Sequence, residues 1–167
     1  MVESFIVSHR RDFDGLASAA ELVRYLRGSV KNVIFTNPNK SEMLPAISKL
    51  EPAKNAEIYI ADLSVPQEGY EDIYAKLRTI KAAGNTIKWV DHHPWSSGAM
   101  AKFATITYML ICGEDKSNCA AELIYKNFCK SDEVSKKLAE LAHFTDFNIR
   151  PQDKQLDEAL VKISQCI

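Results

Sequence analysis

Thr86-Ile87-Lys88-Trp89-Val90 is followed without a break by Asp91-His92-His93. A short apolar run that stops at polar residues is typical of a buried strand. The three residues after the run supply one carboxylate and two imidazoles, side chains that bind metal ions and phosphate groups. This stretch therefore predicts a strand whose carboxyl end delivers chemically active side chains.

The same arrangement occurs twice nearer the N-terminus. Ser4-Phe5-Ile6-Val7-Ser8 precedes His9, Asp12 and Asp14, and Ile58-Tyr59-Ile60-Ala61 precedes Asp62. Three predicted strands thus end in the same kinds of side chain, and this repetition carries more weight than any single motif. It indicates an active site.

Segments with helical periodicity separate these strands. Gly15–Leu26 and Tyr70–Ile80 place apolar residues at helical spacing, and Ser41 is a candidate cap for a shorter helix. Val30–Thr36 is predicted to be one more strand. Strands that alternate with helices predict an α/β fold, with a doubly wound, mainly parallel sheet and helices on both faces.

The pattern changes after Pro94. Lys102–Ile111 is predicted to be a further strand, and helices are expected near Ser117–Cys129, Ser131–Phe144 and Gln152–Ser164. The C-terminal part is therefore expected to be helical. Because the sequence contains no linker, low-complexity segment or internal repeat, residues 1–167 are expected to form a single domain.

Composition excludes several classes of protein. Apolar residues make up 46% of the chain and charged residues 26%, as in an ordinary globular protein. The net charge of −1 gives no reason to expect non-specific binding to nucleic acid or to a membrane. The sequence has no signal-peptide pattern and no apolar run near the about 20 residues of a membrane helix, so we expect a cytoplasmic protein. The four cysteines lack the paired spacing of zinc and redox motifs.

The carboxyl ends of parallel strands share one edge of the sheet, where ligands bind. The predicted strand ends would gather four aspartates and three histidines there: Asp12, Asp14, Asp62, Asp91, His9, His92 and His93. So many carboxylates would repel one another without cations. Two divalent ions about 3.5–4 Å apart, bridged by one carboxylate, would compensate them and suit displacement at phosphorus. We expect Mn²⁺, with Mg²⁺, Zn²⁺ or Fe²⁺ as alternatives for such a mixed ligand set.

Three segments carry a resemblance to a known family. They are Ser8-His9-Arg10-Arg11-Asp12-Phe13-Asp14-Gly15-Leu16-Ala17-Ser18-Ala19-Ala20, then Ala61-Asp62-Leu63, then Val90-Asp91-His92-His93-Pro94. In order and spacing they resemble the first three motifs of the DHH phosphoesterases. That superfamily includes RecJ-type exonucleases, nanoRNases, cyclic-dinucleotide phosphodiesterases and manganese-dependent inorganic pyrophosphatases. The resemblance extends from residue 4 to about residue 150 and implies a catalytic domain of this type.

The resemblance also implies metal ligands. His9 and Asp12 would bind a first ion, Asp62 would bridge the two ions, and Asp14 and His92 would bind the second. The family uses one more Asp near the end of a later helix. Asp146, in Phe144-Thr145-Asp146-Phe147, is the best match and would be a further ligand of the second ion. On the residues alone, the alternative for Asp146 is an ordinary acidic residue near a helix end, and the alternative for Asp12 and Asp14 is a helix cap.

The remaining residues of the motifs imply catalytic and substrate-binding roles. His93 would face the phosphate, and Asp91 would orient its neighbours, so these two are the predicted catalytic residues. Gly15 would let an anion approach the start of a helix. Arg10 and Arg11 are predicted to contact phosphate, with solvated surface charge as the alternative.

Three residues outside the motifs have competing interpretations. Trp95 would either stack against a base or pack within its loop. Arg150 is another candidate phosphate ligand for which surface charge is the alternative. His143, on an otherwise apolar helix face, is interpreted as structural.

Family members usually carry a second domain with basic and glycine-rich substrate contacts, and this chain is expected to lack it. The chain would then be the catalytic domain of a longer protein, a variant that functions alone, or a member for which a homodimer or a partner supplies the missing half. The predicted function is metal-dependent hydrolysis of phosphodiester bonds in short oligonucleotides or small phosphorylated nucleotides, in the manner of an exonuclease or phosphodiesterase. The alternatives are a pyrophosphatase-like hydrolase and a non-hydrolytic metal- and nucleotide-binding regulatory module.

Overall fold

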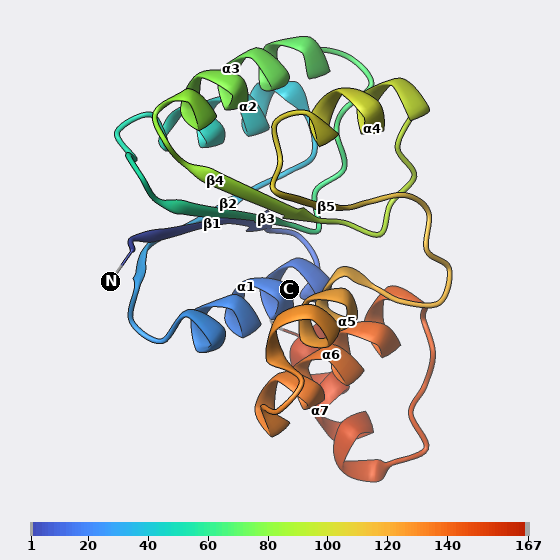
Figure 1. Ribbon diagram of the computed structural model, residues 1–167. Helices are drawn as coiled ribbons and strands as arrows, with labels where there is room; N and C mark the ends of the chain where they lie inside the picture. Colours follow the sequence, from blue (N-terminus) through green and yellow to red (C-terminus); the bar gives the residue numbers. More distant parts are fainter. Residues whose placement is uncertain (1, 166–167) are drawn as a thin grey trace.

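The computed structural model describes residues 2–165, and a five-stranded sheet lies at its centre (Figure 1). The strands are β1 (Ser4–His9), β2 (Val30–Thr36), β3 (Glu57–Ala61), β4 (Thr86–Val90) and β5 (Met109–Ile111). They lie in the order β2-β1-β3-β4-β5, and every neighbouring pair is parallel. The predicted doubly wound α/β fold is confirmed.

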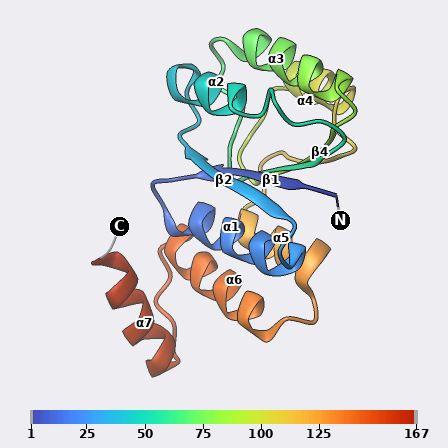
Figure 2. The ribbon, with the colours of Figure 1, turned by 90° about the vertical axis from the view of Figure 1, so that its left-hand side faces the viewer.

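Helices cover both faces of the sheet (Figures 1 and 2). One face carries α2 (Lys40–Ser48), α3 (Tyr70–Ala82) and α4 (Ser97–Ala104). The other face carries α1 (Phe13–Leu26), α5 (Ala120–Ile124), the π-helical turn η1 (Tyr125–Cys129) and α6 (Glu133–Asp146), and α7 (Lys154–Ser164) lies beside α6. The predicted helical C-terminal part is confirmed. Among residues 2–165, no helix combines the length and the apolarity that a bilayer crossing requires.

Successive residues of the strands contribute to two separate apolar cores. In β1, Ile6 packs with the core on the α1 side, whereas Val7 packs with the core under α2 and α3. In β4, Val90 and Trp89 divide in the same way. Because both faces are covered, the central strands β1 and β3 carry continuous apolar runs instead of alternating patterns, which is why they stand out in the sequence.

The register of the strands aligns the residues that follow them. Ala61 of β3 pairs with Ser8 of β1 and with Val90 of β4, so the next residue of each strand, Asp62 among them, emerges at the same level. The chain also passes from β1 to β2 on one side and then to β3 on the other side of β1. In open α/β sheets a ligand crevice lies beyond the strand ends at such a switch point.

The predicted strand at Lys102–Ile111 is wrong over most of its length, because α4 extends into this segment and only Met109–Ile111 joins the sheet. Ser96 caps α4 by accepting a hydrogen bond from Ala99 N at 3.2 Å. Ala99 and Phe103, four residues apart, are both buried, so the apolar residues of this segment follow a helical period. The cap and the period together favour the helix.

The cap of one helix differs from the prediction, and the cap of another matches an alternative stated for Asp12. Asn39, not Ser41, caps α2, and its side-chain oxygen accepts from Glu42 N at 3.0 Å. Asp12 caps α1 and accepts from Gly15 N at 2.9 Å. Asn and Asp are as effective as Ser in this position, so neither cap could be chosen from residue type alone.

Glu21 is a fully buried acidic residue of α1. Neither of its carboxyl oxygens has a hydrogen-bond partner among the described residues. Burial, together with the negative charges of Asp14 and Asp132, raises the pKa of Glu21 to about 9. A carboxyl group with a raised folded-state pKa stabilises the fold fully only below its unfolded pKa, 4.5, and this contribution is lost as the pH rises toward 9.

Glu21→Gln is therefore expected to raise the free energy of unfolding at pH 7 by about 2–3 kcal/mol relative to its effect at pH 4.5. Urea unfolding in EDTA across this pH range measures the difference. Glu158→Gln, at an exposed position of α7, is the control and should show little change at either pH. An effect of Glu21→Gln that does not depend on pH would contradict the assignment of a neutral buried carboxyl.

Candidate metal centre

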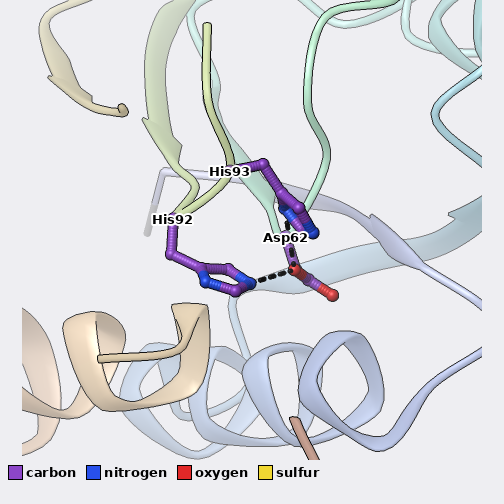
Figure 3. A group of neighbouring side chains, drawn as sticks. All are labelled: Asp62, His92 and His93. Carbon is purple, nitrogen blue, oxygen red and sulfur yellow. Dashed lines mark ion pairs between the residues drawn. The ribbon is translucent and has the colours of Figure 1, made fainter. Parts of the chain in front are cut away.

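All six predicted metal ligands lie together at the carboxyl edge of the sheet. They come from the end of β1 (His9), the start of α1 (Asp12 and Asp14), the residue after β3 (Asp62), the loop after β4 (His92) and the end of α6 (Asp146). Figure 3 shows the imidazoles of His92 and His93 directed at the Asp62 carboxylate from the loop after β4. Segments far apart in the sequence thus meet at one point.

His9, Asp12 and Asp62 form one group, with ligand atoms that all lie within 4.8 Å of one another. Nδ1 of His9 is 2.5 Å from Oδ2 of Asp12 and 3.5 Å from Oδ2 of Asp62. The Asp12 side chain is 44% exposed, whereas the Asp62 side chain is buried. These are the residues that the resemblance assigns to the first ion and to the bridge.

Asp14, His92 and Asp146 form a second group with the same spacing. Nε2 of His92 is 3.6 Å from Oδ2 of Asp14 and 3.8 Å from Oδ2 of Asp146. Asp14 is buried, and the Asp146 side chain is 22% exposed. These are the residues that the resemblance assigns to the second ion.

Asp62 lies between the two groups. Its Oδ2 faces His9, and its Oδ1 lies 3.7 Å from His92 Nε2 and 3.7 Å from His93 Nδ1 (Figure 3). Each carboxylate oxygen is therefore directed toward a different set of imidazoles. A carboxylate in this arrangement is suited to bridge two cations.

The backbone at Asp62 has an unusual conformation. Asp62 has a φ of 52°, in the left-handed region, immediately after the strand, and its N–H donates to Val90 O at 3.0 Å. Asp tolerates this conformation better than most residues, but it is uncommon and clusters at functional sites. The turn ends β3 and directs the side chain into the cluster.

Gly15 allows α1 to start in contact with β1. A Cβ at this position would lie 2.4 Å from the carbonyl oxygen and 2.7 Å from Cβ of His9, closer than real side chains approach. The Gly15 N–H donates to Asp12 Oδ1, and its carbonyl accepts from Ser8 Oγ at 2.7 Å. Gly15 was predicted to let an anion approach the start of this helix. In the structure, the group that approaches Gly15 closely is His9.

Backbone N–H groups hold Asp14 in place. Its Oδ2 accepts from Ala120 N and its Oδ1 from Ala121 N, each at 2.8 Å. Both donors lie at the N-terminus of α5, where the helix dipole also favours a negative charge. Burial nevertheless raises the pKa of Asp14, and these hydrogen bonds oppose that effect.

Several atoms of the cluster are buried without a hydrogen-bond partner among residues 2–165. They are both carboxyl oxygens of Asp62 and Nε2 of His92. Burial, and then the negative charges of Asp14, Asp12 and Asp91, raise the pKa of Asp62 well above its ordinary value. Buried polar atoms without partners are costly, and cations would satisfy all of these atoms at once. The donor set therefore fits divalent metal ions.

His93 lies at the rim of the cluster, where it belongs to a third group of possible metal ligands with Asp62 and His92 and also pairs with Asp91. The fully buried Asp91 accepts from His93 Nδ1 at 2.8 Å through Oδ1 and from Trp95 Nε1 at 2.7 Å through Oδ2. This hydrogen bond to Asp91 raises the pKa of His93, although partial burial opposes it. The His93 side chain is 41% exposed, whereas the His92 side chain is 9% exposed. Of these two imidazoles, a substrate can reach that of His93.

The remaining candidates for contacts with a substrate lie outside the ligand cluster. Arg10 is exposed beside His9, and its guanidinium lies 3.2 Å from Oε2 of Glu42. Arg11 is exposed. Trp95 is buried and packs edge-to-face against Trp89 and Phe103, which favours the packing interpretation over base stacking. The guanidinium of Arg150 forms two hydrogen bonds with Asp157, at 2.9 and 2.8 Å.

The groups that support Asp14 were not predicted from the sequence. The donors are backbone N–H groups of two alanines, which no residue type identifies. Glu122 is different, because it lies three residues after the cap residue Cys119, and its side chain accepts from Cys119 N at 3.1 Å. The spacing is that of a capping box, but a Cys in place of the usual Ser or Thr at the cap removes the sequence signature.

Known proteins resemble this chain both in sequence and in three-dimensional structure. The profile described as the DHH family, N-terminal domain, matches residues 3–145. Two solved structures share the fold. An uncharacterized protein from Helicobacter pylori G27 superposes with a TM-score of 0.63 at 16% identity, over 99% of this chain and 50% of its own. An exopolyphosphatase-related protein from Bacteroides fragilis gives 0.50 at 13% identity, over 98% of this chain and 53% of its own. The chain thus spans about half the length of either, and a search of curated proteins finds no match.

Proposed function

Since this chain belongs to the DHH family, we propose that it is a metal-dependent phosphoesterase that hydrolyses phosphodiester bonds. One observation carries the proposal. The Asp62 carboxylate is buried without a hydrogen-bond partner among the described residues, between two groups of candidate ligands. Two divalent ions, for which Mn²⁺ is our choice, would satisfy this arrangement.

The roles of the ligands follow from the two groups. His9 and Asp12 would hold one ion, Asp14, His92 and Asp146 the other, and Asp62 both. Ions bound there would lower the pKa of a water molecule and neutralise the oxygens of a phosphoryl group. The fixed backbone at Asp62 and the N–H groups around Asp14 would keep the ligands in place without reorganisation.

His93 and Asp91 would act on the substrate. Asp91 holds Nδ1 of His93 and favours the protonated imidazole, so the ring can donate to a phosphoryl oxygen as negative charge develops. Asp91 itself is fully buried and is fixed by Trp95, so its role is to orient His93. His93 would thus be the residue in contact with the transition state.

The substrate class follows from charge. Arg10 and Arg11 are exposed next to His9, and Glu42 holds the Arg10 guanidinium on the side of α2. This supports contacts with a few phosphates, and a net charge of −1 does not favour long nucleic acids. The proposed substrates are short oligonucleotides or small phosphorylated nucleotides.

The proposed organisation is a single catalytic domain. The chain spans about half the length of the two solved structures. We therefore also propose that a second surface, outside this domain, contributes to substrate binding. A second copy of the chain or a partner would provide it.

Hydrolysis of a short 5′-labelled RNA, with Mn²⁺ or with EDTA, tests the proposed function. The Asp91→Ala/His92→Ala double variant should lose the Mn²⁺-dependent cleavage. Arg10→Ala should raise KM with little change in kcat, whereas Arg150→Ala, with its guanidinium paired to Asp157, is the matched control. Cleavage of pyrophosphate but not RNA would favour the pyrophosphatase alternative. Nucleotide binding without cleavage of either would favour the regulatory module.

A further inference from the structure

We propose that Glu122 is a positioning residue of the metal centre, which ties together the two carboxylates of the second group, Asp14 and Asp146. The inference rests on the proposed function, since it concerns the same ligands. Glu122 lies in α5 and contacts neither carboxylate itself. It acts through the start of α5 on one side and through α6 on the other.

The first link joins Glu122 to Asp14. The Oε2 atom of Glu122 accepts from Cys119 N at 3.1 Å and so fixes the residue that caps α5. The next two N–H groups of the chain, those of Ala120 and Ala121, donate to Asp14 at 2.8 Å each. The bond to Cys119 N thus holds the first turn of α5, where these two donors lie.

The second link joins Glu122 to Asp146. The same Oε2 atom accepts from His143 Nδ1 at 2.8 Å, across the interface between α5 and α6. His143 lies three residues before Asp146, so both side chains occupy neighbouring positions on one side of α6. The bond therefore fixes the last turn of α6 relative to the start of α5.

Aromatic contacts continue this link to His92. The His143 ring lies 4.8 Å from the ring of Phe147, and Phe147 lies 6.5 Å from the ring of His92 in an edge-to-face arrangement. Hydrogen bonds and ring contacts therefore connect the Glu122–His143 pair to each member of the second group. The first group comes from β1, the cap of α1 and the end of β3, and none of its members is bonded to α5 or α6 among the described residues.

This asymmetry predicts a selective effect on the two sites. Groups that orient metal ligands change metal affinity by about 10- to 100-fold when they are removed. In Glu122→Ala the affinity of one Mn²⁺ should fall by that factor, while the affinity of the other stays near the wild-type value. Glu122→Gln keeps an acceptor oxygen of the same shape and should restore most of the lost affinity.

Calorimetric titration of Mn²⁺ into the metal-free protein measures both affinities without reference to activity. Glu140→Ala, in α6, is the matched control, because Glu140 makes no hydrogen bond or ion pair among residues 2–165. His143→Leu removes the donor to Glu122 and should weaken the same ion as Glu122→Ala. Thermal unfolding in EDTA reports the cost to the fold, which should be similar for Glu122→Ala and His143→Leu.

The outcomes separate the inference from the proposed function. Two unchanged affinities in a folded Glu122→Ala variant would overturn the positioning role and leave the phosphoesterase proposal intact. Equal weakening of both ions, without rescue by Glu122→Gln, would also overturn it, because a general loss of structure would explain that result. Failure of the wild-type protein to bind Mn²⁺ would overturn both.

Discussion

Asp62→Asn is expected to lower metal-dependent hydrolysis by at least about 10³-fold, a barrier increase of about 4 kcal/mol. The reason is the position of Asp62 between the two groups of ligands, where one carboxylate serves both. Asn keeps the size of the side chain and tolerates the left-handed φ of 52°, so the variant should fold. Retained activity would exclude Asp62 as a bridging ligand.

The same substitution should stabilise the metal-free protein. The pKa of Asp62 is raised, so its contribution to stability is present below the unfolded pKa and is lost as the pH rises. At neutral pH the wild-type protein holds a buried carboxyl group near three other carboxylates, which lowers its free energy of unfolding. Asn has no charge, so the substitution removes this destabilisation. In EDTA at pH 7 the melting temperature of Asp62→Asn should exceed that of the wild type, and the gap should narrow toward pH 4. Added Mn²⁺ should reverse the order, because the wild type, with its bridging carboxylate, would gain more from binding. A variant that is less stable in EDTA at pH 7 would contradict this reading.

Gly15→Ala is expected to destabilise the protein by about 3 kcal/mol or more, a large effect for one methyl group. The new Cβ would lie 2.4 Å from the backbone oxygen of His9, and backbone atoms cannot move aside as the end of a side chain can. To relieve the overlap, α1 must separate from β1. His9 would then move away from Asp12 and Asp62, so Mn²⁺ binding should weaken as well.

Gly98→Ala provides the matched control for this substitution. Gly98 lies in the first turn of α4, and a Cβ there would meet no atom within 4 Å. Because Ala is the better helix former, the control should be neutral or stabilising by up to about 1 kcal/mol. Urea unfolding measures both variants. Similar values for the two would show that α1 and β1 are not held in contact at Gly15.

The sequence was sufficient to predict the layered α/β fold and the gathering of the candidate ligands at one edge of the sheet. Buried parallel strands are short apolar runs, and the polar residues after β1, β3 and β4 mark the edge where a ligand binds. The predicted ligands, from His9 to Asp146, also lie together. These features follow from chain order and residue type, which a sequence contains.

Other features depend on contacts that residue types do not specify. The segment before β5 combined β-branched and apolar residues, but the cap at Ser96 and the burial of Phe103 favoured a helix there. The support of Asp14 by Ala120 and Ala121 comes from backbone groups, so it required the position of α5. The role of His143 likewise depends on how α6 packs against α5, since its partner Glu122 is 21 residues away.

The most direct test of the central claim is anomalous X-ray scattering at the manganese edge from crystals grown with Mn²⁺. We expect two peaks about 3.5–4 Å apart, one on each side of the Asp62 carboxylate. One peak should contact His9 and Asp12, and the other Asp14, His92 and Asp146. No peak at this cluster, or peaks confined to other acidic residues, would contradict the two-metal account.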